Sequence, residues 1–428
     1  MAKEGDYIRI ITEDEEFKGI LMPRPELLEK GIKVIKLDTG YNLGIDEKRI
    51  KKIEVIEKYT PKVHKKRKIS FNKKLPTVSI ISLGGTISSK IDYRTGGVYA
   101  DYTAEDFVEM CPELEKVANI RARKALSLMS EDINPNDWKD IAKIIFDELK
   151  TCDGIVVTQG TDTLHFTTAA MSFFLKDLGK PVIFTASQRS IDRGSSDAFM
   201  NLICAVSAAA KFDFAGVASC LHGTLNDDYC ILNRGVKVRK MHTSRRDAFR
   251  PVNEMPLAKV FPDGKIEVLN KDYKKRSGND CILDNKFEEK TALITIYPGM
   301  DPEIIDFYIR KGYKGIVLAA TALGHVPVLV KKYSLEQYLK KAYDKGVAVV
   351  IASQTLYGRT HPYVYSNLRK LSIGLRCIYA EDMLPETAYI KLGWVLGNTN
   401  DIAEVRRMML ENIAGEINMR HQPSSFLY

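Results

Sequence analysis

The sequence lacks the features of a membrane-embedded, exported or disulfide-stabilised protein. None of its apolar runs approaches the ~18 consecutive residues that a membrane span requires. The first residues, Met-Ala-Lys-Glu-Gly-Asp, contain no apolar signal core. The 7 cysteines are scattered and form no Cys-x-x-Cys pair, which argues against a disulfide framework or a zinc ribbon. These absences predict a cytoplasmic protein.

Motifs for metals and nucleotide cofactors are also missing. The sequence has no His-x-x-x-His pair and no carboxylate cluster at ligand spacing. Its glycine-containing turns match neither Gly-x-Gly-x-x-Gly nor Gly-x-x-x-x-Gly-Lys-Ser/Thr. We therefore expect no metal site and no cofactor in this chain.

The composition is that of an ordinary globular protein, with 45% hydrophobic and 28% charged residues. The net charge of +9 is compatible with contact to nucleic acid but does not establish it. Lysine and arginine are concentrated between residues 58 and 74. Such a segment either binds phosphate groups or serves as a solvated linker, and we expect the linker.

The N-terminal 70 residues differ in pattern from the rest. Short alternating segments at 6–11, 17–22, 32–37 and 41–45 are separated by glycine, proline and aspartate. Strands at this spacing predict a small antiparallel β-barrel. We therefore assign residues 1–70, including the basic linker, to a barrel domain.

Beyond residue 75, apolar strands alternate with helical patterns, which predicts an α/β fold with mostly parallel sheets. A polar interval at 271–280 divides this region into a domain at 75–280 and another at 290–428. From residue 400, an amphipathic helix is predicted to follow a polar capping residue. The predicted strands are 78–83, 153–158, 180–187, 214–219, 292–296, 315–319 and 347–351, and the predicted helices are 164–178, 198–212, 303–311 and 334–345.

Two of these strands end in turns that contain glycine and threonine. Gly84 and Gly85 precede Thr86, and Gly160 precedes Thr161 and Asp162. Each turn by itself is compatible with an ordinary strand end. If the two strands are neighbours, however, their turns converge at the carboxyl edge of the sheet, where α/β proteins bind ligands.

Hydroxyl groups in both turns favour acyl transfer as the reaction class. A threonine hydroxyl is a weak nucleophile until a base activates it. A lysine near an aspartate in a dry cleft can lose its proton and act as that base, and Lys240 in the basic stretch 234–243 is a candidate. His165, one turn after Asp162, is also available, although it fits an ordinary helix-face histidine.

Three motifs resemble those of the bacterial-type L-asparaginase family. They are Gly84-Gly-Thr-Ile87, Thr158-Gln-Gly-Thr-Asp-Thr163 and Tyr297-Pro-Gly-Met300, and the resemblance extends from about residue 75 to 400. With the added barrel, the helical tail and the segment 383–394, the whole chain resembles the asparaginase-like D subunits of archaeal glutamyl-tRNA(Gln) amidotransferases.

The resemblance implies a two-domain asparaginase fold that releases ammonia from asparagine or glutamine. It implies a partner, the E subunit of the amidotransferase, that uses ATP and Mg²⁺ to amidate misacylated Glu-tRNA(Gln). It also implies a dimer within a heterotetramer. A free-standing cytoplasmic asparaginase and a non-catalytic binding scaffold are the alternatives.

The resemblance also implies roles for individual residues. Thr86 is the first nucleophile and Tyr99 activates it, while Thr161, Asp162 and Lys240 activate a hydroxyl or water. Independently, backbone N–H groups of the 159–161 turn are candidates for binding the oxyanion that forms during acyl transfer.

Substrate recognition is implied at Ser130 and Glu131, which fall where the family holds the α-amino and carboxylate groups. Secreted asparaginases often have glutamine in place of Glu131. A carboxylate suits an α-ammonium group, but the difference leaves the preferred amide open.

Overall fold

The computed structural model describes residues 2–22, 31–39, 41–59, 71–85, 87, 89–91, 98–100, 111–191 and 195–428, with the backbone alone at 89–91 and 98–100. The chain forms two compact units, Met1–Lys68 with Ser89–Asp101, and Ile69–Ser88 with Tyr102–Tyr428. A finer division of the second unit near residues 280–290 stays a prediction.

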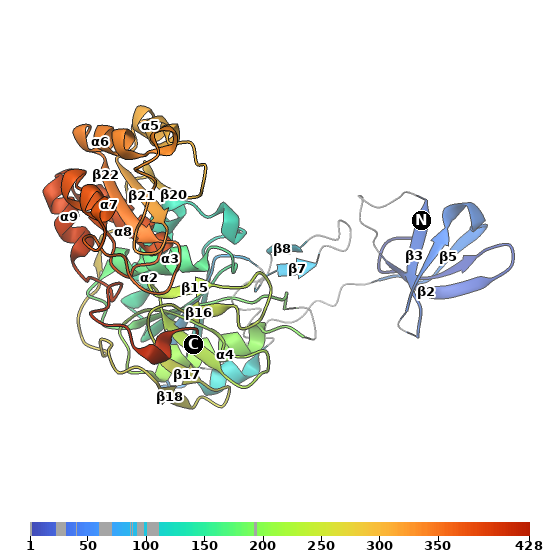
Figure 1. Cartoon of the computed structure of the whole chain (residues 1–428). Coiled ribbons are helices and arrows are strands. Elements are labelled where there is room, and N and C mark those ends of the chain that lie inside the picture. Colours follow the sequence, from blue (N-terminus) through green and yellow to red (C-terminus); the bar gives the residue numbers. More distant parts are fainter. Residues whose placement is uncertain are drawn as a thin grey trace. The chain divides into compact units, whose positions relative to one another are not determined.

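The first unit contains a curved, antiparallel five-stranded sheet in the order β4-β3-β2-β1-β5 (Figure 1). Alternating residues of these strands form its small core, for example Ile8, Ile10 and Ile35. The four predicted strands are confirmed, and β5 is a fifth that was not predicted. The strands are β1 Tyr7–Ile11, β2 Glu16–Met22, β3 Ile32–Lys36, β4 Asn42–Asp46 and β5 Lys52–Glu57, with a separate hairpin of β7 Ser89–Ile91 and β8 Val98–Ala100.

The second unit begins with an eight-stranded sheet in the order β18-β17-β14-β13-β12-β10-β6-β9. The five strands from β13 to β9 are parallel, as predicted, whereas β14, β17 and β18 are antiparallel. The strands are β6 Thr77–Ser82, β9 Asn119–Lys124, β10 Gly154–Thr158, β12 Pro181–Thr185, β13 Gly216–His222, β14 Cys230–Arg234, β17 Ala258–Val260 and β18 Ile266–Val268.

Helices cover both faces of this sheet. On one face lie α2 (Pro135–Leu149) and α3 (Leu164–Phe174), and on the other lies α4 (Ala198–Lys211). Asn134 caps α2 by accepting a hydrogen bond from the Asn136 N–H, and Asp137 completes a capping box with Asn134. The central strand β10 is buried along its whole length, so its near-continuous apolar sequence predicted it correctly.

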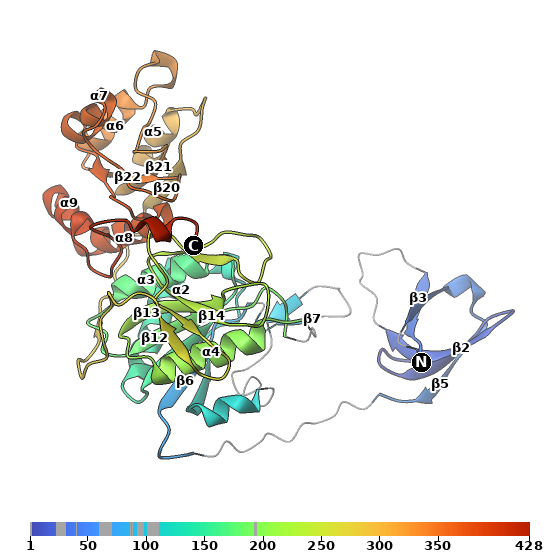
Figure 2. The same cartoon turned by 60° about the horizontal axis from the view of Figure 1, so that its bottom comes forward.

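A smaller parallel sheet, in the order β20-β21-β22-β23, follows in the chain. Its face toward α5 and α6 forms one core, and its opposite face packs on α8, which also contacts α3 (Figure 2). Asp401 caps α9, as the polar cap predicted. The elements are β20 Thr291–Thr295, β21 Gly315–Ala320, β22 Ala348–Ser353, β23 Ile378–Tyr379, α5 Glu303–Arg310, α6 Glu336–Asp344, α7 Ser366–Arg369, α8 Pro385–Asn398 and α9 Ile402–Leu410.

Two short antiparallel strand pairs complete the second unit. β11 (Leu175–Lys176) pairs with β19 (Ile282–Leu283), next to the segment 271–280 that was predicted to be a linker. β15 (Val238–Lys240) pairs with β16 (Phe249–Pro251), and this second pair includes the candidate base Lys240.

Candidate active site

The two threonine-containing turns follow neighbouring parallel strands. β6 and β10 are paired in parallel, with Ser82 opposite Thr158 at their carboxyl ends. β9 lies on the other side of β6, with Lys124 opposite Ser82. The turns after β6, β9 and β10 therefore leave the same edge of the sheet side by side.

Glycines allow these turns to approach one another closely. A Cβ atom on Gly84 would lie 2.6 Å from the Leu128 carbonyl oxygen, in the turn after β9. One on Gly85 would lie 2.1 Å from the backbone nitrogen of Gly160, in the turn after β10. Both glycines also have positive φ, +102° and +78°, which side chains disfavour. The convergence expected from the sequence is thus present in the backbone.

Two residues implied as catalytic are not placed by the structure. Thr86 lies outside the described residues, although its neighbour Gly85 is in contact range of Gly160. The backbone of Tyr99 pairs with Lys90 in the β7–β8 hairpin, and its side chain lies outside the described part. Their catalytic roles stay predictions.

Lys240, Thr161 and Asp162 lie together. The Nζ atom of Lys240 donates hydrogen bonds to Thr161 Oγ1 at 2.8 Å and to Asp162 Oδ1 at 2.6 Å. Thr161 Oγ1 is also 3.3 Å from Asp162 Oδ1. The Lys240 side chain is 10% exposed, while that of Asp162 is 63% exposed. A mostly buried lysine in contact with a threonine hydroxyl and a carboxylate has the geometry for proton transfer.

Ser130 joins this group from the turn after β9. Its Oγ accepts a hydrogen bond from the Asp162 N–H at 3.2 Å, and its carbonyl accepts one from Thr163 Oγ1 at 2.5 Å. Ser130 is buried, and Glu131, the next residue of the same 3₁₀ turn, is exposed. Both residues implied in substrate recognition therefore lie beside the Thr161 turn.

One expected oxyanion donor is already engaged. The N–H of Gln159 donates to the Thr185 carbonyl at 3.1 Å, because the β10–β12 ladder continues one residue past the strand. The expectation for this N–H group is therefore wrong. In contrast to this backbone group, both polar atoms of the Gln159 side-chain amide are buried and have no hydrogen-bond partner among the described residues.

His165 lies on α3, close to the group formed by Lys240 and Asp162. Burial lowers its pKa to about 3, and the nearby cations Arg239 and Lys240 add to this effect. His165 is thus a neutral, buried helix residue at neutral pH, as the simpler interpretation of the sequence held. Sequence reasoning did not foresee that it would lie near Lys240.

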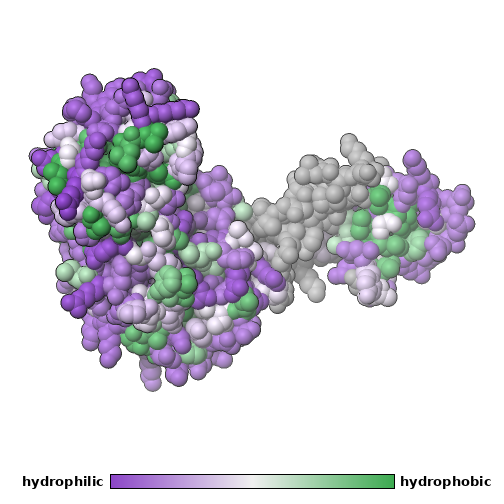
Figure 3. All heavy atoms as spheres, in the orientation of Figure 1, coloured by the Kyte–Doolittle hydropathy of each residue, from purple (hydrophilic) through white to green (hydrophobic). Residues whose placement is uncertain are grey.

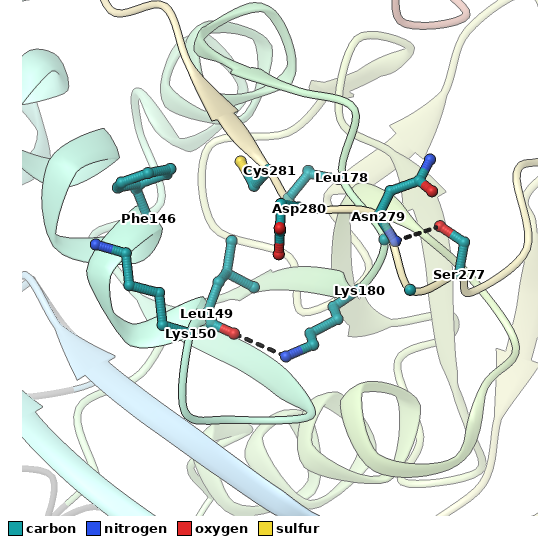
Figure 4. Close-up of a pocket in the computed structure, with 11 residues that line it drawn as sticks. Phe146, Leu149, Lys150, Leu178, Lys180, Ser277, Asn279, Asp280 and Cys281 are labelled. Atoms are coloured by element: carbon teal, nitrogen blue, oxygen red, sulfur yellow. Dashed lines mark hydrogen bonds between the residues drawn. The ribbon is translucent and has the colours of Figure 1, made fainter.

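A well-formed cavity in the described part lies away from these turns. Its volume is about 490 Å³, and it is formed by the end of α2, the turn before β12 and residues 277–281 (Figure 4). There Lys180 donates to the carbonyls of Leu149 and Cys152, both at 2.7 Å. This cavity is at the amino ends of β10 and β12, opposite the threonine turns, and it contains no group of hydroxyl, lysine and carboxylate in contact.

The visible face of the second unit is mostly hydrophilic, with hydrophobic residues in small groups (Figure 3). Among the described helices, none is both long and apolar enough to cross a bilayer. Nor do the described residues include three His, Cys, Asp or Glu side chains grouped so that they could hold a metal ion.

Family models match three successive parts of the chain. The model for "Asparaginase, N-terminal" matches residues 77–274, and that for "Glutaminase/Asparaginase C-terminal domain" matches 290–409. The model for "GatD N-terminal domain" matches residues 2–56. The D subunit of the glutamyl-tRNA(Gln) amidotransferase of Pyrococcus furiosus is 50% identical over an alignment of 430 positions that covers 99% of this chain and 97% of that protein. The chain belongs to the family of glutamyl-tRNA(Gln) amidotransferase D subunits.

Other members of this family are similar over nearly their whole lengths. The D subunit from Methanothermobacter thermautotrophicus is 45% identical over 419 residues, which are 97% of this chain and 94% of that protein. Among solved structures, the thermostable L-asparaginase from Thermococcus kodakarensis has a TM-score of 0.71 and 30% identity. It is matched over 100% of its own length but over 80% of this chain. The asparaginase-like fold predicted from the sequence is confirmed.

Proposed function

We propose that this chain is the ammonia-releasing subunit of a tRNA-dependent amidotransferase. The contact of Lys240 with Thr161 and Asp162 supports this most directly, because it brings a lysine, a hydroxyl and a carboxylate together at the carboxyl edge of the sheet. The similarity to D subunits over nearly the whole chain adds the biological setting.

The reaction proposed here has two steps. The hydroxyl of Thr86, activated by Tyr99, adds to the side-chain carbonyl carbon of glutamine or asparagine. The C–N bond breaks, the nitrogen takes up the hydroxyl proton, and ammonia leaves an ester on Thr86. Water, activated by Lys240 with Thr161 and Asp162, then hydrolyses the ester, which frees the acid and restores the hydroxyl.

Substrate recognition is proposed for the neighbouring turns. Glu131 is exposed beside the buried Ser130, so a carboxylate is available for the α-ammonium group of the amino acid. The unpaired amide of Gln159, 1% exposed, would find complementary donors and acceptors in a carboxamide. Such pairing would offset the cost of burying an unsatisfied polar group.

The partner is proposed to be the E subunit of the amidotransferase, which would bind ATP and Mg²⁺ and transfer the ammonia to Glu-tRNA(Gln). The assembly would be a heterotetramer in the cytoplasm that contains two copies of this chain. The N-terminal unit supports this proposal over a free-standing asparaginase, because the match to the solved asparaginase leaves 20% of this chain uncovered.

Ammonia release distinguishes the proposals. The chain should be assayed with glutamine and with asparagine, alone and with the purified E subunit and misacylated tRNA. An amidotransferase component is expected to release ammonia faster when both are present. Rapid release by the isolated chain that neither addition changes would instead indicate a free-standing asparaginase. A non-catalytic scaffold predicts that Thr86→Ala changes neither ammonia release nor tRNA amidation.

A further inference from the structure

Lys240 lies on a hairpin whose base is held by distant parts of the chain. It is the last residue of β15, three residues after Lys237, so the two are separated by about 10 Å along the strand. Across the hairpin, the Val252 N–H donates to the Lys237 carbonyl at 2.8 Å. Whatever fixes Lys237 therefore also fixes the start of the strand that presents Lys240 to Thr161.

Lys237 is fixed by an ion pair with Asp382, which precedes α8. Lys237 Nζ lies 2.7 Å from Asp382 Oδ2, and the two side chains are 1% and 0% exposed. Burial opposes ionisation of Asp382, but the Lys237 ammonium and donors from Asn418 and His421 hold the pKa of this carboxyl below its usual value. A buried charge pair of this kind persists only with well-formed partners on both sides.

The C-terminal tail supplies those further partners. The backbone N–H and the side-chain amide of Asn418 each donate to an oxygen of Asp382 at 3.0 Å. The same amide donates to the Asn253 carbonyl at 2.9 Å. His421 Nε2 lies 3.1 Å from Asp382 Oδ2. The tail thus contacts both the hairpin base and the segment before α8.

Asn253 closes the arrangement from the other strand of the hairpin. Its side-chain amide donates to the carbonyls of Leu356, Gly358 and Asp382 at 3.1, 3.1 and 3.2 Å. Its Oδ1 accepts from the Gly358 N–H at 2.8 Å. We call the four residues Lys237, Asn253, Asp382 and Asn418 the clamp.

Three residues with positive φ lie in the clamp or beside it. Asn253, Leu356 and Glu381 have φ values of +63°, +70° and +57°. Asparagine tolerates this region, but leucine and glutamate adopt it only at a cost in free energy. Such strain is retained where the surroundings impose one backbone conformation. The contacts of the clamp therefore fix the backbone at this place.

Arg239, the immediate neighbour of Lys240, has its own partner on α8. Its guanidinium lies 2.8 Å from Glu386 Oε1 in the first turn of that helix. In the same turn, Thr387 Oγ1 donates to the Val236 carbonyl at 3.0 Å. The segment that ends at Lys240 is therefore held to the C-terminal half of the chain at three positions, Val236, Lys237 and Arg239.

We propose that Asp382 and Asn418 are positioning residues, which act through Lys237 and the β15–β16 hairpin to hold Lys240 in contact with Thr161. This inference rests on the proposed function, since it assumes that Lys240 takes part in ammonia release. It assigns the C-terminal tail a part in catalysis although the tail contacts neither Lys240 nor Thr161 in the described structure.

Asn418→Ala tests the proposal in the full chain assembled with its partner. The variant keeps the backbone donor to Asp382 and loses the side-chain amide. We expect kcat for ammonia release to fall about tenfold with KM changed by less than about twofold, because the catalytic group moves while substrate contacts remain. Asp382→Asn is expected to have the same kinetic effect, and Asn418→Ala suffices if Asp382→Asn does not fold.

A double-mutant cycle separates positioning from general damage. If the clamp acts through Lys240, adding Asn418→Ala to Lys240→Ala should lower the residual rate by less than about twofold. Leu339→Ala is the matched control: it leaves a cavity in the core between α6 and the smaller sheet, away from the clamp. That variant should lose thermal stability but keep kcat at temperatures where it is folded.

Three results would overturn the inference. Folded Asn418→Ala and Asp382→Asn proteins with kcat near that of the native chain would show that the clamp is structural only. An equal fall in rate with and without Lys240 would show that the effect does not pass through Lys240. Native activity in Lys240→Ala itself would remove the proposed catalytic set, and the clamp's role with it.

Discussion

The backbone of Gly85 lies against that of Gly160, so closely that a single added carbon would come within 2.1 Å of the Gly160 nitrogen. These residues are far apart in sequence and belong to turns after two neighbouring strands. Each is followed directly by a threonine. The contact is therefore what brings the two threonine-containing turns to one place.

Gly85→Ala should abolish this approach. The new methyl group would meet backbone atoms that cannot rotate away, and φ at this position is +78°. We expect ammonia release to fall by about 10²-fold or more, because displacement of a catalytic turn by ~1 Å is enough for such a loss. The rate at saturating glutamine or asparagine measures it.

Gly346→Ala is the control for backbone strain alone. Gly346 also has a positive φ, +68°, but a Cβ atom there would have no heavy atom within 4 Å. This variant should lose about 1–2 kcal/mol of stability, the cost of a Cβ atom in the left-handed region, and retain activity. Equal activity losses in the two variants would contradict the argument from the Gly85–Gly160 contact.

The hydroxyl of Thr161 should be required, and its methyl group should not. Thr161→Val keeps the shape but removes the atom that lies 2.8 Å from Lys240 Nζ. We expect kcat to fall by about 10²–10⁴-fold, the usual range for a lost proton-transfer partner. Thr161→Ser restores an oxygen and should recover most of the rate. A Val variant as active as the Ser variant would exclude Thr161 from proton transfer.

Acidification should destabilise the protein partly through His165. Burial, with Arg239 and Lys240 nearby, lowers the His165 pKa from 6.5 to about 3 in the folded state. Between these values the unfolded chain binds a proton that the folded chain does not. The His165 contribution to the free energy of unfolding should therefore fall by about 1.4 kcal/mol per pH unit as the pH drops below 6.5.

His165→Gln isolates this contribution from other titrating groups. The difference in free energy of unfolding between the native chain and the variant should shrink steadily from pH 6.5 to 4.5. Denaturant titrations at several pH values give that difference. Parallel pH dependences for the two proteins would show that His165 is protonated equally in both states.

A second buried ion pair anchors the start of the C-terminal tail. Lys391 Nζ on α8 lies 2.5 Å from Glu416 Oε1, and both side chains are 0% exposed. Glu416→Gln leaves a buried ammonium without its counter-ion, so we expect a loss of about 3–5 kcal/mol in the free energy of unfolding. Replacing both residues by apolar ones should recover most of that loss.

An exposed pair supplies the comparison. Lys340 and Asp344 lie 3.2 Å apart on α6, with side chains 66% and 52% exposed. Asp344→Asn should change the free energy of unfolding by less than about 0.5 kcal/mol, because water screens this pair. Chemical denaturation of both variants measures the two losses in the free energy of unfolding. A loss for Glu416→Gln as small as that for Asp344→Asn would contradict this prediction.

Local sequence patterns were sufficient to predict much of the fold. Local sequence alone indicates four elements: the buried strands β6 and β10, the helix after Thr163 and the capped helix α9. The antiparallel strands β14, β17 and β18 were not predicted, because strand direction within a sheet is decided by tertiary pairing.

In the basic stretch 234–243, the sequence does not predict which partner each cation has. Its cations have different partners: Lys237 pairs with Asp382, Arg239 with Glu386, and Lys240 with Asp162. Two of the three partners lie more than 140 residues away, so nothing local distinguishes these cations. The one available signal was that Lys237 stands between two valines, which hints at burial.

The central claim is that both threonine turns surround one amide, and affinity labelling tests it most directly. An analogue of glutamine or asparagine with an electrophilic diazoketone in place of the carboxamide should alkylate the nucleophile, and peptide mapping by mass spectrometry locates the adduct. The account predicts labelling on the peptide that contains Thr86, blocked by excess substrate and slowed in Tyr99→Phe. Substrate-protected labelling at any other residue would contradict it.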